Sequence, residues 1–478
     1  MNPADRADLL EIARGRVADG RRLQDAGLLA TNGDFFPSVH YPPITMYPPI
    51  REEELFATYA NPADLLFDVY AHIPFCPGRC LFCHYPVKYG DRPAEKERYL
   101  AALEKEMDLS LGRFGLGKIK ARSILVGGGT PTFLTPGQLE RFLGFFTDRL
   151  DRSRTRQFNY DVDPTTLIGP EGLERLAILK GFGVDRLTIG VQSLDPGVLG
   201  YMNRLNTVEQ AMESIGNAKA LGFQVNIEFI FGHPGQTLDG WIAEMERAVT
   251  LDADEIQLYR LKVEAYGDFQ GAVKSFMQGK PGAMPGPEET IMMKQAAIGI
   301  LSARGYHENL RRVFSRRRQD FSLYAHNQCC RLFDEIGFGL TAFSSLRDRF
   351  VLNTQHFDEY YRRIGEGRLP VNRGLVRSGE EQIRWAIVLP LKNRNVRKEH
   401  FRRVTGASLD DVFRGKIRAL SDFGLVHEDR QVLELTPLGA FFADEVAQQF
   451  HNPDFLPFPR PAYAEGPLNP YRNTGVYT

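Results

Sequence analysis

Three of the five cysteines in this 478-residue chain, Cys76, Cys80 and Cys83, stand together in one short stretch. From residue 70 the stretch reads Tyr-Ala-His-Ile-Pro-Phe-Cys-Pro-Gly-Arg-Cys-Leu-Phe-Cys-His-Tyr, and it overlaps the end of a strand-like run. Thiolates this close can converge on one inorganic centre, because Pro77 and Gly78 let the loop fold back on itself. Iron–sulfur clusters usually take four cysteine thiolates, so three would leave one iron open to a small molecule.

Two plainer interpretations compete with a cluster. A zinc site would need a fourth ligand at a comparable second pair, and the sequence shows none. The cysteines could also be packing residues, since free cysteine often behaves as a small buried hydrophobic residue. Three cysteines at this spacing in a cysteine-poor chain favour the cluster over both alternatives.

Residues suited to ligand binding also lie on the next candidate strands or directly after them. They are the glycines 127–129 with Thr130, then Asp161, Gln192 with Arg204 beyond it, and Glu228. Glycines let backbone groups approach a ligand, an arginine fork suits a carboxylate, and an amide can bridge hydroxyl groups. Chemistry in α/β barrels lies at the C-terminal ends of the strands. We therefore expect these residues to share one site with the cysteines.

Strands alternate with helices from residue 65 onward, which predicts a parallel sheet with crossover helices. The expected strands are 67–73, 123–126, 157–162, 186–191, 224–231 and 255–261. The expected helices are 94–111, 136–150, 169–179, 207–220 and 237–251. Six such units indicate an α/β fold with an incomplete (β/α)6 barrel, open on one side.

The flanking regions have other patterns. A helix is expected at 4–23, followed by a proline- and aromatic-rich arm that we expect to wrap over another surface. Helical runs at 380–388 and 409–423, then a hairpin within 425–439, predict a C-terminal winged-helix-like α+β domain. The expected parts are an N-terminal helix and arm (1–65), the barrel (66–305), a connecting and closing region (306–375) and the C-terminal domain with its tail (376–478).

Composition limits the class of protein. A chain of this length exceeds what one core usually supports, so two or three domains are expected. A net charge of −1 argues against a general polyanion-binding surface, and nucleic acid is not an expected partner. No apolar run reaches the length of a membrane span, and the first residues do not resemble a signal peptide. Five cysteines do not make a disulfide framework, which fits a reducing cytoplasm.

The cysteine motif resembles the signature of the radical S-adenosylmethionine (SAM) superfamily. Its flanking Tyr-x-His-Ile-Pro-Phe-Cys is similar to the coproporphyrinogen III dehydrogenase-like (HemN-like) subfamily, and the resemblance covers roughly residues 65–450. It implies a radical SAM barrel whose [4Fe–4S] cluster is held by Cys76, Cys80 and Cys83. It also implies that an external flavodoxin- or ferredoxin-type donor reduces the cluster, which cleaves SAM to a 5′-deoxyadenosyl radical that takes hydrogen from a small-molecule substrate.

The resemblance also implies roles for residues around the cluster. Tyr70 would lie beside the sulfonium of SAM, because an aromatic face favours a cation. Asp161 stands where the family usually has Glu, and Glu228 stands where it typically has Asp. The residues implied as cofactor contacts are Tyr70, Phe82, Gly128, Gly129, Thr130, Asp161, Gln192, Arg204 and Glu228, and those implied in catalysis are Tyr70 and Tyr85.

Two departures from the subfamily pattern bear on the reaction. True coproporphyrinogen dehydrogenases usually carry a fourth cysteine where Tyr85 stands, and the segment 327–330 lacks their aromatic–glutamine–glycine pattern. Together with the long arm and tail, these departures favour the class C methylases of natural-product pathways. These are thought to bind two SAM molecules, and one of them donates carbon.

The leading hypothesis is therefore a C-methyltransferase or cyclopropanase acting on an unsaturated or aromatic small molecule, with a partner methyltransferase as a further expected protein. Coproporphyrinogen III dehydrogenase is the alternative, together with a haem chaperone or an anaerobic haem-opening methylase. The adjacent Cys329 and Cys330 are expected to pack rather than react, since no base or second metal ligand is identifiable near them.

Overall fold

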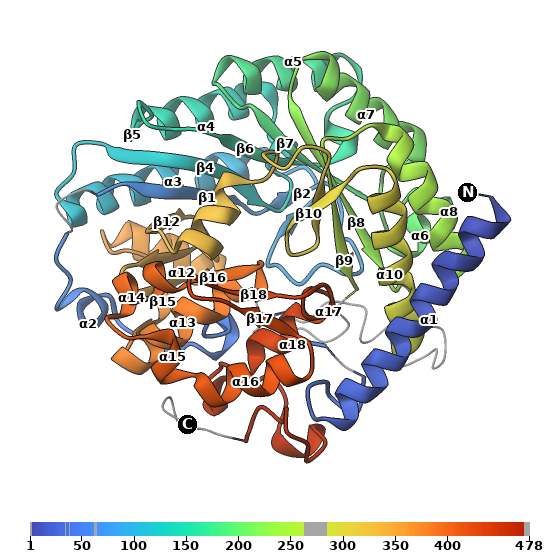
Figure 1. Ribbon diagram of the computed structural model, residues 1–478. Helices are drawn as coiled ribbons and strands as arrows, with labels where there is room; N and C mark the ends of the chain where they lie inside the picture. Colours follow the sequence, from blue (N-terminus) through green and yellow to red (C-terminus); the bar gives the residue numbers. More distant parts are fainter. Residues whose placement is uncertain (1, 34, 38, 62–64, 262–283, 473–478) are drawn as a thin grey trace.

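The computed structural model describes residues 2–33, 35–37, 39–61, 65–261 and 284–472 (Figure 1). Its centre is a curved sheet in which six strands run parallel, in the order β9-β8-β7-β6-β4-β1. These strands are β1 (Phe67–Ile73), β4 (Ile119–Gly128), β6 (Phe158–Val162), β7 (Arg186–Gln192), β8 (Gln224–Phe231) and β9 (Glu255–Arg260). The expected incomplete (β/α)6 barrel is confirmed. Strand β4 begins four residues earlier than expected, because Ile119 and Ala121 are also buried and Ile119 pairs with β5 (Leu150–Asp151).

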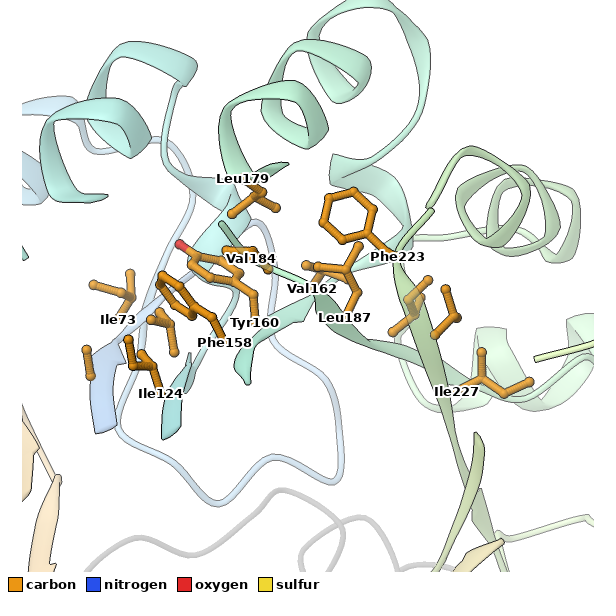
Figure 2. Packing of buried hydrophobic residues seen from close by; sticks show 14 of the residues in the cluster. Ile73, Ile124, Phe158, Tyr160, Val162, Leu179, Val184, Leu187, Phe223 and Ile227 are labelled. Atoms are coloured by element: carbon orange, nitrogen blue, oxygen red, sulfur yellow. The ribbon is translucent and has the colours of Figure 1, made fainter. Parts of the chain in front are cut away.

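Helices cover the outer face of this sheet, as Figure 1 shows. They are α3 (Pro93–Phe114), α4 (Pro136–Asp148), α5 (Gly169–Gly181), α7 (Val208–Ala220) and α8 (Leu238–Ala248), with the short α6 (Pro196–Tyr201) after β7. Thr135 and Thr207 cap α4 and α7, and a glutamine three residues on returns a hydrogen bond in each case. Side chains of neighbouring strands, among them Phe158, Tyr160 and Leu187, pack with Leu179 of α5 in one core (Figure 2).

The connecting region extends the sheet at both ends. On one side β11 (Val313–Ser315) pairs with β9 and with β10 (His307–Leu310). On the other side β12 (Glu335–Phe338) runs parallel to β1 and leads into the antiparallel strands β13 (Phe343–Leu346), β14 (Arg349–Asn353) and β15 (Val371–Val376). These strands are three to six residues long, so they leave little periodicity in the sequence. The division of the chain into domains stays a prediction.

The C-terminal region carries the expected helices and hairpin. Its elements are α13 (Gly379–Lys392), β16 (Asn395–Arg397), α14 (Lys398–Thr405), α15 (Leu409–Val412), α16 (Arg414–Asp422), β17 (Val426–Glu428), β18 (Val432–Leu435), α17 (Pro437–Phe441) and α18 (Ala443–Gln448). The three strands form one small sheet in the order β16-β18-β17. The single helix expected at 409–423 is wrong, because Phe413, at φ −129° and ψ 17°, interrupts it.

The N-terminal arm and the C-terminal tail tie the molecule together. Helix α1 (Pro3–Asp25) lies along α10 (Pro287–Ala303), as Figure 1 shows. In the arm, Tyr41 is fully buried and donates a 2.7 Å hydrogen bond to Glu381 of α13. Phe458 and Tyr463 of the tail pack with Ala30 and Phe36 in a small cluster. The remaining α-helices in the described part of the chain are α2 (Glu52–Phe56), α11 (Leu323–His326) and α12 (Phe357–Gly365). None of the described helices is long and apolar enough to cross a membrane.

Candidate active site

The cysteine loop leaves the C-terminal end of β1. Cys76 ends the short strand β2 (Phe75–Cys76), which pairs with β3 (Lys88–Tyr89) and so closes the loop at its base. All three thiols are half-buried, and the Cys83 N–H donates to the Cys80 carbonyl at 3.2 Å. Burial raises the pKa of the Cys76 thiol to about 12, and the charges of Cys83 and Cys80 add to this increase. The three sulfurs are therefore close enough to influence one another.

The donor chemistry fits an iron–sulfur cluster, since three thiols on one loop are the ligands such clusters take. Among the described residues, no three His, Cys, Asp or Glu side chains already stand in an arrangement that could hold a metal ion. The assignment of Cys76, Cys80 and Cys83 as ligands stays a prediction.

The glycine run at the end of β4 lies directly against this loop. The Thr130 N–H donates to the Phe75 carbonyl at 2.7 Å, and the Thr130 hydroxyl is 3.6 Å from Cys76 Sγ. A Cβ on Gly129 would stand 2.9 Å from Cys76 Sγ, and one on Gly128, at φ 119°, would stand 2.9 Å from the His72 ring. The backbone here can approach a cluster only because these positions lack side chains.

Arg204 reaches the same loop from beyond β7. Its Nη2 lies 2.8 Å from Asp163 Oδ2 and 2.7 Å from the Gly190 carbonyl, and its Nη1 lies 3.4 Å from Cys80 Sγ. Burial opposes its charge, but Asp163 and Cys80 outweigh that effect and raise the pKa of Arg204. A ligand carboxylate would have to share this fork with Asp163. No role for Asp163 is expected from the sequence, although its place directly after β6 was a signal.

Gln192 has an unfilled hydrogen-bonding capacity. It ends β7 at φ 68°, and its side chain is 7% exposed. Its Oε1 is buried and has no hydrogen-bond partner in the part of the chain that the structure describes. A buried amide oxygen without a partner is costly, so this atom fits a ligand hydroxyl at the rim.

Two carboxyl groups face the interior of the barrel. Burial raises the pKa of Asp161 to about 8, and the negative charge of Glu228 adds to the shift. Burial likewise raises the pKa of Glu228 to about 7, opposed by the Tyr259 hydroxyl, which donates to it at 3.2 Å. Tyr259 was missed in the sequence, although alternation along β9 puts it on the same face as Gln257.

Tyr70, His72 and Tyr85 form an aromatic group at the end of β1. The Tyr70 hydroxyl lies 2.9 Å from His72 Nδ1, and the rings of His72 and Tyr85 are 6.2 Å apart. Tyr85 exposes 59% of its surface, yet burial raises its pKa and the charges of Cys83, Asp161 and Glu228 reinforce the shift. Phe82 packs nearby, on Ile230 and Leu261.

Comparison with known proteins identifies two families that parts of this chain match and several similar proteins. Residues 70–248 match the radical SAM superfamily, and residues 378–442 match the HemN C-terminal domain. Heme chaperone HemW of Bacillus subtilis is 29% identical, over 80% of this chain and 98% of its own length. Oxygen-independent coproporphyrinogen III oxidase of Helicobacter pylori is 25% identical, over 84% of this chain and 90% of its own.

The solved structure of the Escherichia coli coproporphyrinogen III oxidase HemN, a radical SAM enzyme, superposes with a TM-score of 0.74 at 23% identity. It covers 86% of this chain and 97% of that one, which confirms the radical SAM fold. None of these three proteins is named for methylation, so they agree with the alternative hypothesis better than with the leading one.

Proposed function

We propose that this chain, which carries a radical SAM domain and a HemN C-terminal domain, abstracts hydrogen from a carboxylate-bearing tetrapyrrole of the coproporphyrinogen class. The observation that carries the proposal is the similarity to a coproporphyrinogen III oxidase over 84% of the chain, which includes the barrel and the C-terminal region. A protein of the flavodoxin or ferredoxin type would deliver the electron.

When bound, a [4Fe–4S] cluster and SAM would supply a carbon radical that takes hydrogen from the substrate. The chain provides the setting for this chemistry. Arg204 brings a positive charge to the cysteine loop, and Gln192 offers its free amide oxygen to a ligand hydroxyl. Burial lowers the pKa of His72 to about 3, so this ring stays neutral beside Tyr70.

Asp161 has a different part in this setting. Because its pKa is about 8, it keeps its proton at neutral pH and can donate a hydrogen bond to a bound ligand. A carboxyl group that is neutral at this position does not repel a substrate that carries carboxylates.

A second candidate is C-methylation or cyclopropanation with a second SAM as the carbon donor, and one observation favours it. Tyr85 occupies the place of the fourth cysteine, and its exposed ring lies 6.2 Å from that of His72, beside the other residues of the site. The altered segment 327–330 gives this candidate less support. Asn327 donates a 2.8 Å hydrogen bond to the buried Asp68, and burial raises the pKa of both Cys329 and Cys330, so this segment serves the packing.

SAM labelled in its methyl group separates these candidates. Reconstituted protein, reductant and coproporphyrinogen III should yield 5′-deoxyadenosine and carbon dioxide, with no label in the product and no S-adenosylhomocysteine. Label in the product together with S-adenosylhomocysteine would support the methylation candidate instead. Stoichiometric haem binding without turnover would contradict both and indicate a chaperone.

A further inference from the structure

A cavity of about 360 Å³ lies far from the cysteine loop, between the C-terminal region and the π-helical turn Asn327–Arg331. Hydrogen bonds hold this turn against the N-terminal ends of the barrel strands. Asn327 bonds to Asp68, the second residue of β1, and the Leu323 N–H donates at 2.7 Å to Gln157, which precedes β6. The cysteine loop leaves the opposite end of β1, which is roughly 20 Å away at the usual rise of about 3.3 Å per residue.

Four arginines line this cavity. They are Arg331 from the turn, Arg394 and Arg397 at β16, and Arg403 of α14, and Glu399 is the one acidic residue of the lining. Within the described residues, none of the four forms an ion pair with a carboxylate, whereas Arg186, Arg204 and many other arginines of this chain do. The net charge of the whole chain is −1, so this positive group is a local feature.

The positive charge of these arginines lowers the pKa of two histidines in the lining. Burial lowers the pKa of His326, and Arg331 and Arg397 lower it further. Burial also lowers the pKa of His400, where Arg403, Arg331 and Arg397 act in the same direction. Arg403 Nη2 lies 2.7 Å from His400 Nδ1. The cavity is thus lined by four solvent-exposed arginines that have no carboxylate partner among the described residues.

We propose that this cavity binds a small polyanion, a molecule with two or more carboxylate or phosphate groups. Several guanidinium forks around one space fit such groups in pairs. Leu310, Pro390 and Val396 add apolar wall, which suits a carbon framework between the charges. The volume is that of a small-molecule pocket rather than of a groove for a duplex. The site is separate from the cluster rim, and the inference goes beyond the proposed function.

Calorimetric titration of the full chain with citrate, pyrophosphate and acetate at low ionic strength tests the proposal. Citrate or pyrophosphate should bind at one molecule per chain, and acetate at least tenfold more weakly. The Arg331→Gln/Arg397→Gln variant should weaken binding at least tenfold, because two charge-assisted hydrogen-bonding groups are removed. Preference for citrate or for pyrophosphate decides between a carboxylate and a phosphate ligand.

Arg430→Gln is the control, since Arg430 is exposed on the β17–β18 turn outside the cavity and its loss removes one positive charge, as each substitution of the double variant does. Its binding should equal that of the unmodified chain. If the double variant unfolds, Arg403→Gln replaces it. Absence of binding, equal loss in the Arg430 control, or a duplex oligonucleotide that pyrophosphate does not displace would each overturn the proposal. The titration needs no SAM cleavage, so its failure is distinct from failure of the proposed function.

Discussion

Arg204 is the residue whose expected role the structure alters most. The sequence indicates a contact to the SAM carboxylate or ribose, but the guanidinium is already paired with Asp163 and lies against Cys80. Arg204→Ala should weaken SAM binding by on the order of 1.5–3 kcal/mol, the usual value of a hydrogen bond to a charged group. Equilibrium dialysis with reconstituted protein measures this effect.

The same substitution should retain the cluster, but it should also lower the cluster's midpoint potential, because a positive charge 3.4 Å from Cys80 Sγ disappears. Arg204→Lys, which keeps the charge without the fork, is the control for the potential. Unchanged SAM affinity in Arg204→Ala would show that Asp163, rather than a ligand, is the real partner of this arginine.

The three cysteines of the loop should be the ligands of a single cluster. Replacing Cys76, Cys80 and Cys83 together with alanine should abolish the visible absorption of anaerobically reconstituted protein. Cys329→Ala and Cys330→Ala should retain it, since both lie on the π-helical turn beside the start of β1, at the opposite end of this strand from the cysteine loop. A normal cluster in the triple variant would rule out this loop as the binding site.

For single residues, the sequence indicates which residue types lie together in the site, but it does not indicate which of them pair with one another. The cysteine spacing and the glycine run are local patterns, and the structure does place Gly129 against Cys76. The partners Asp163 and Tyr259 depend on contacts between different strands, which no local pattern records. For the same reason the free arginines at β16 could not be recognised, because their neighbour Arg331 lies far away in the sequence.

Among the elements, the end of β4 requires glycine at a position directly beside the cysteine loop. A Cβ on Gly129 would stand 2.8 Å from the Phe75 carbonyl and 2.9 Å from Cys76 Sγ, so Gly129→Ala must displace the cysteine loop. We expect the variant to fold but to bind much less iron per chain. Gly144→Ala, in open space within α4, is the control and should raise stability by about 0.5–1 kcal/mol. Full iron loading of Gly129→Ala would contradict the predicted close approach.

Helix α3 is joined to the sheet extension through a buried carboxyl group. Glu106 accepts hydrogen bonds from Tyr360, Asn353 and the Gly339 N–H, at 2.6 to 2.8 Å. Burial raises its pKa from 4.5 to about 7, against the effect of these bonds. Because the pKa of Glu106 is higher in the folded chain than in the unfolded chain, its protonated form stabilises the fold. This contribution to the free energy of unfolding is complete below about pH 4.5 and is lost as the pH rises through 7.

Glu106→Gln should therefore remove a pH-dependent part of the free energy of unfolding. The part amounts to roughly 3 kcal/mol between pH 4.5 and 7.5. Urea unfolding of both proteins across this range measures the difference, in which the other titrating groups cancel. A difference that does not change with pH would show that Glu106 stays ionised throughout.

The elements with strong periodicity are the ones that the sequence predicts well. Strands β1 and β8 have the expected bounds, since each is a buried run with turn residues at both ends. The split between α15 and α16 was missed, because the interruption at Phe413 is made by its backbone and not by a glycine or proline. The strands of the sheet extension were not predicted, because they are too short to leave a clear alternation in the sequence.

For the whole molecule, the N-terminal arm and the C-terminal tail contact parts of the chain that are distant from them in the sequence. Tyr41 donates to Glu381 and accepts a 3.1 Å hydrogen bond from the Asn452 N–H. Tyr41→Phe should lower the free energy of unfolding by about 2 kcal/mol, because the buried Glu381 carboxylate loses a donor. Chemical unfolding measures it, and an unchanged midpoint would show that the arm is held by packing alone.

The position of β12 beside β1 has a consequence for biosynthesis. Asp68 pairs on one side with Ser123, which is made soon afterwards, but on the other side with Glu335. At about 5–20 residues per second, the ribosome needs tens of seconds to reach that second partner. During this interval the nascent chain carries a long apolar strand with one row of unpaired main-chain groups, a template for pairing with other chains. Binding of a chaperone to β1 until residue 338 has emerged would protect the newly made protein from aggregation.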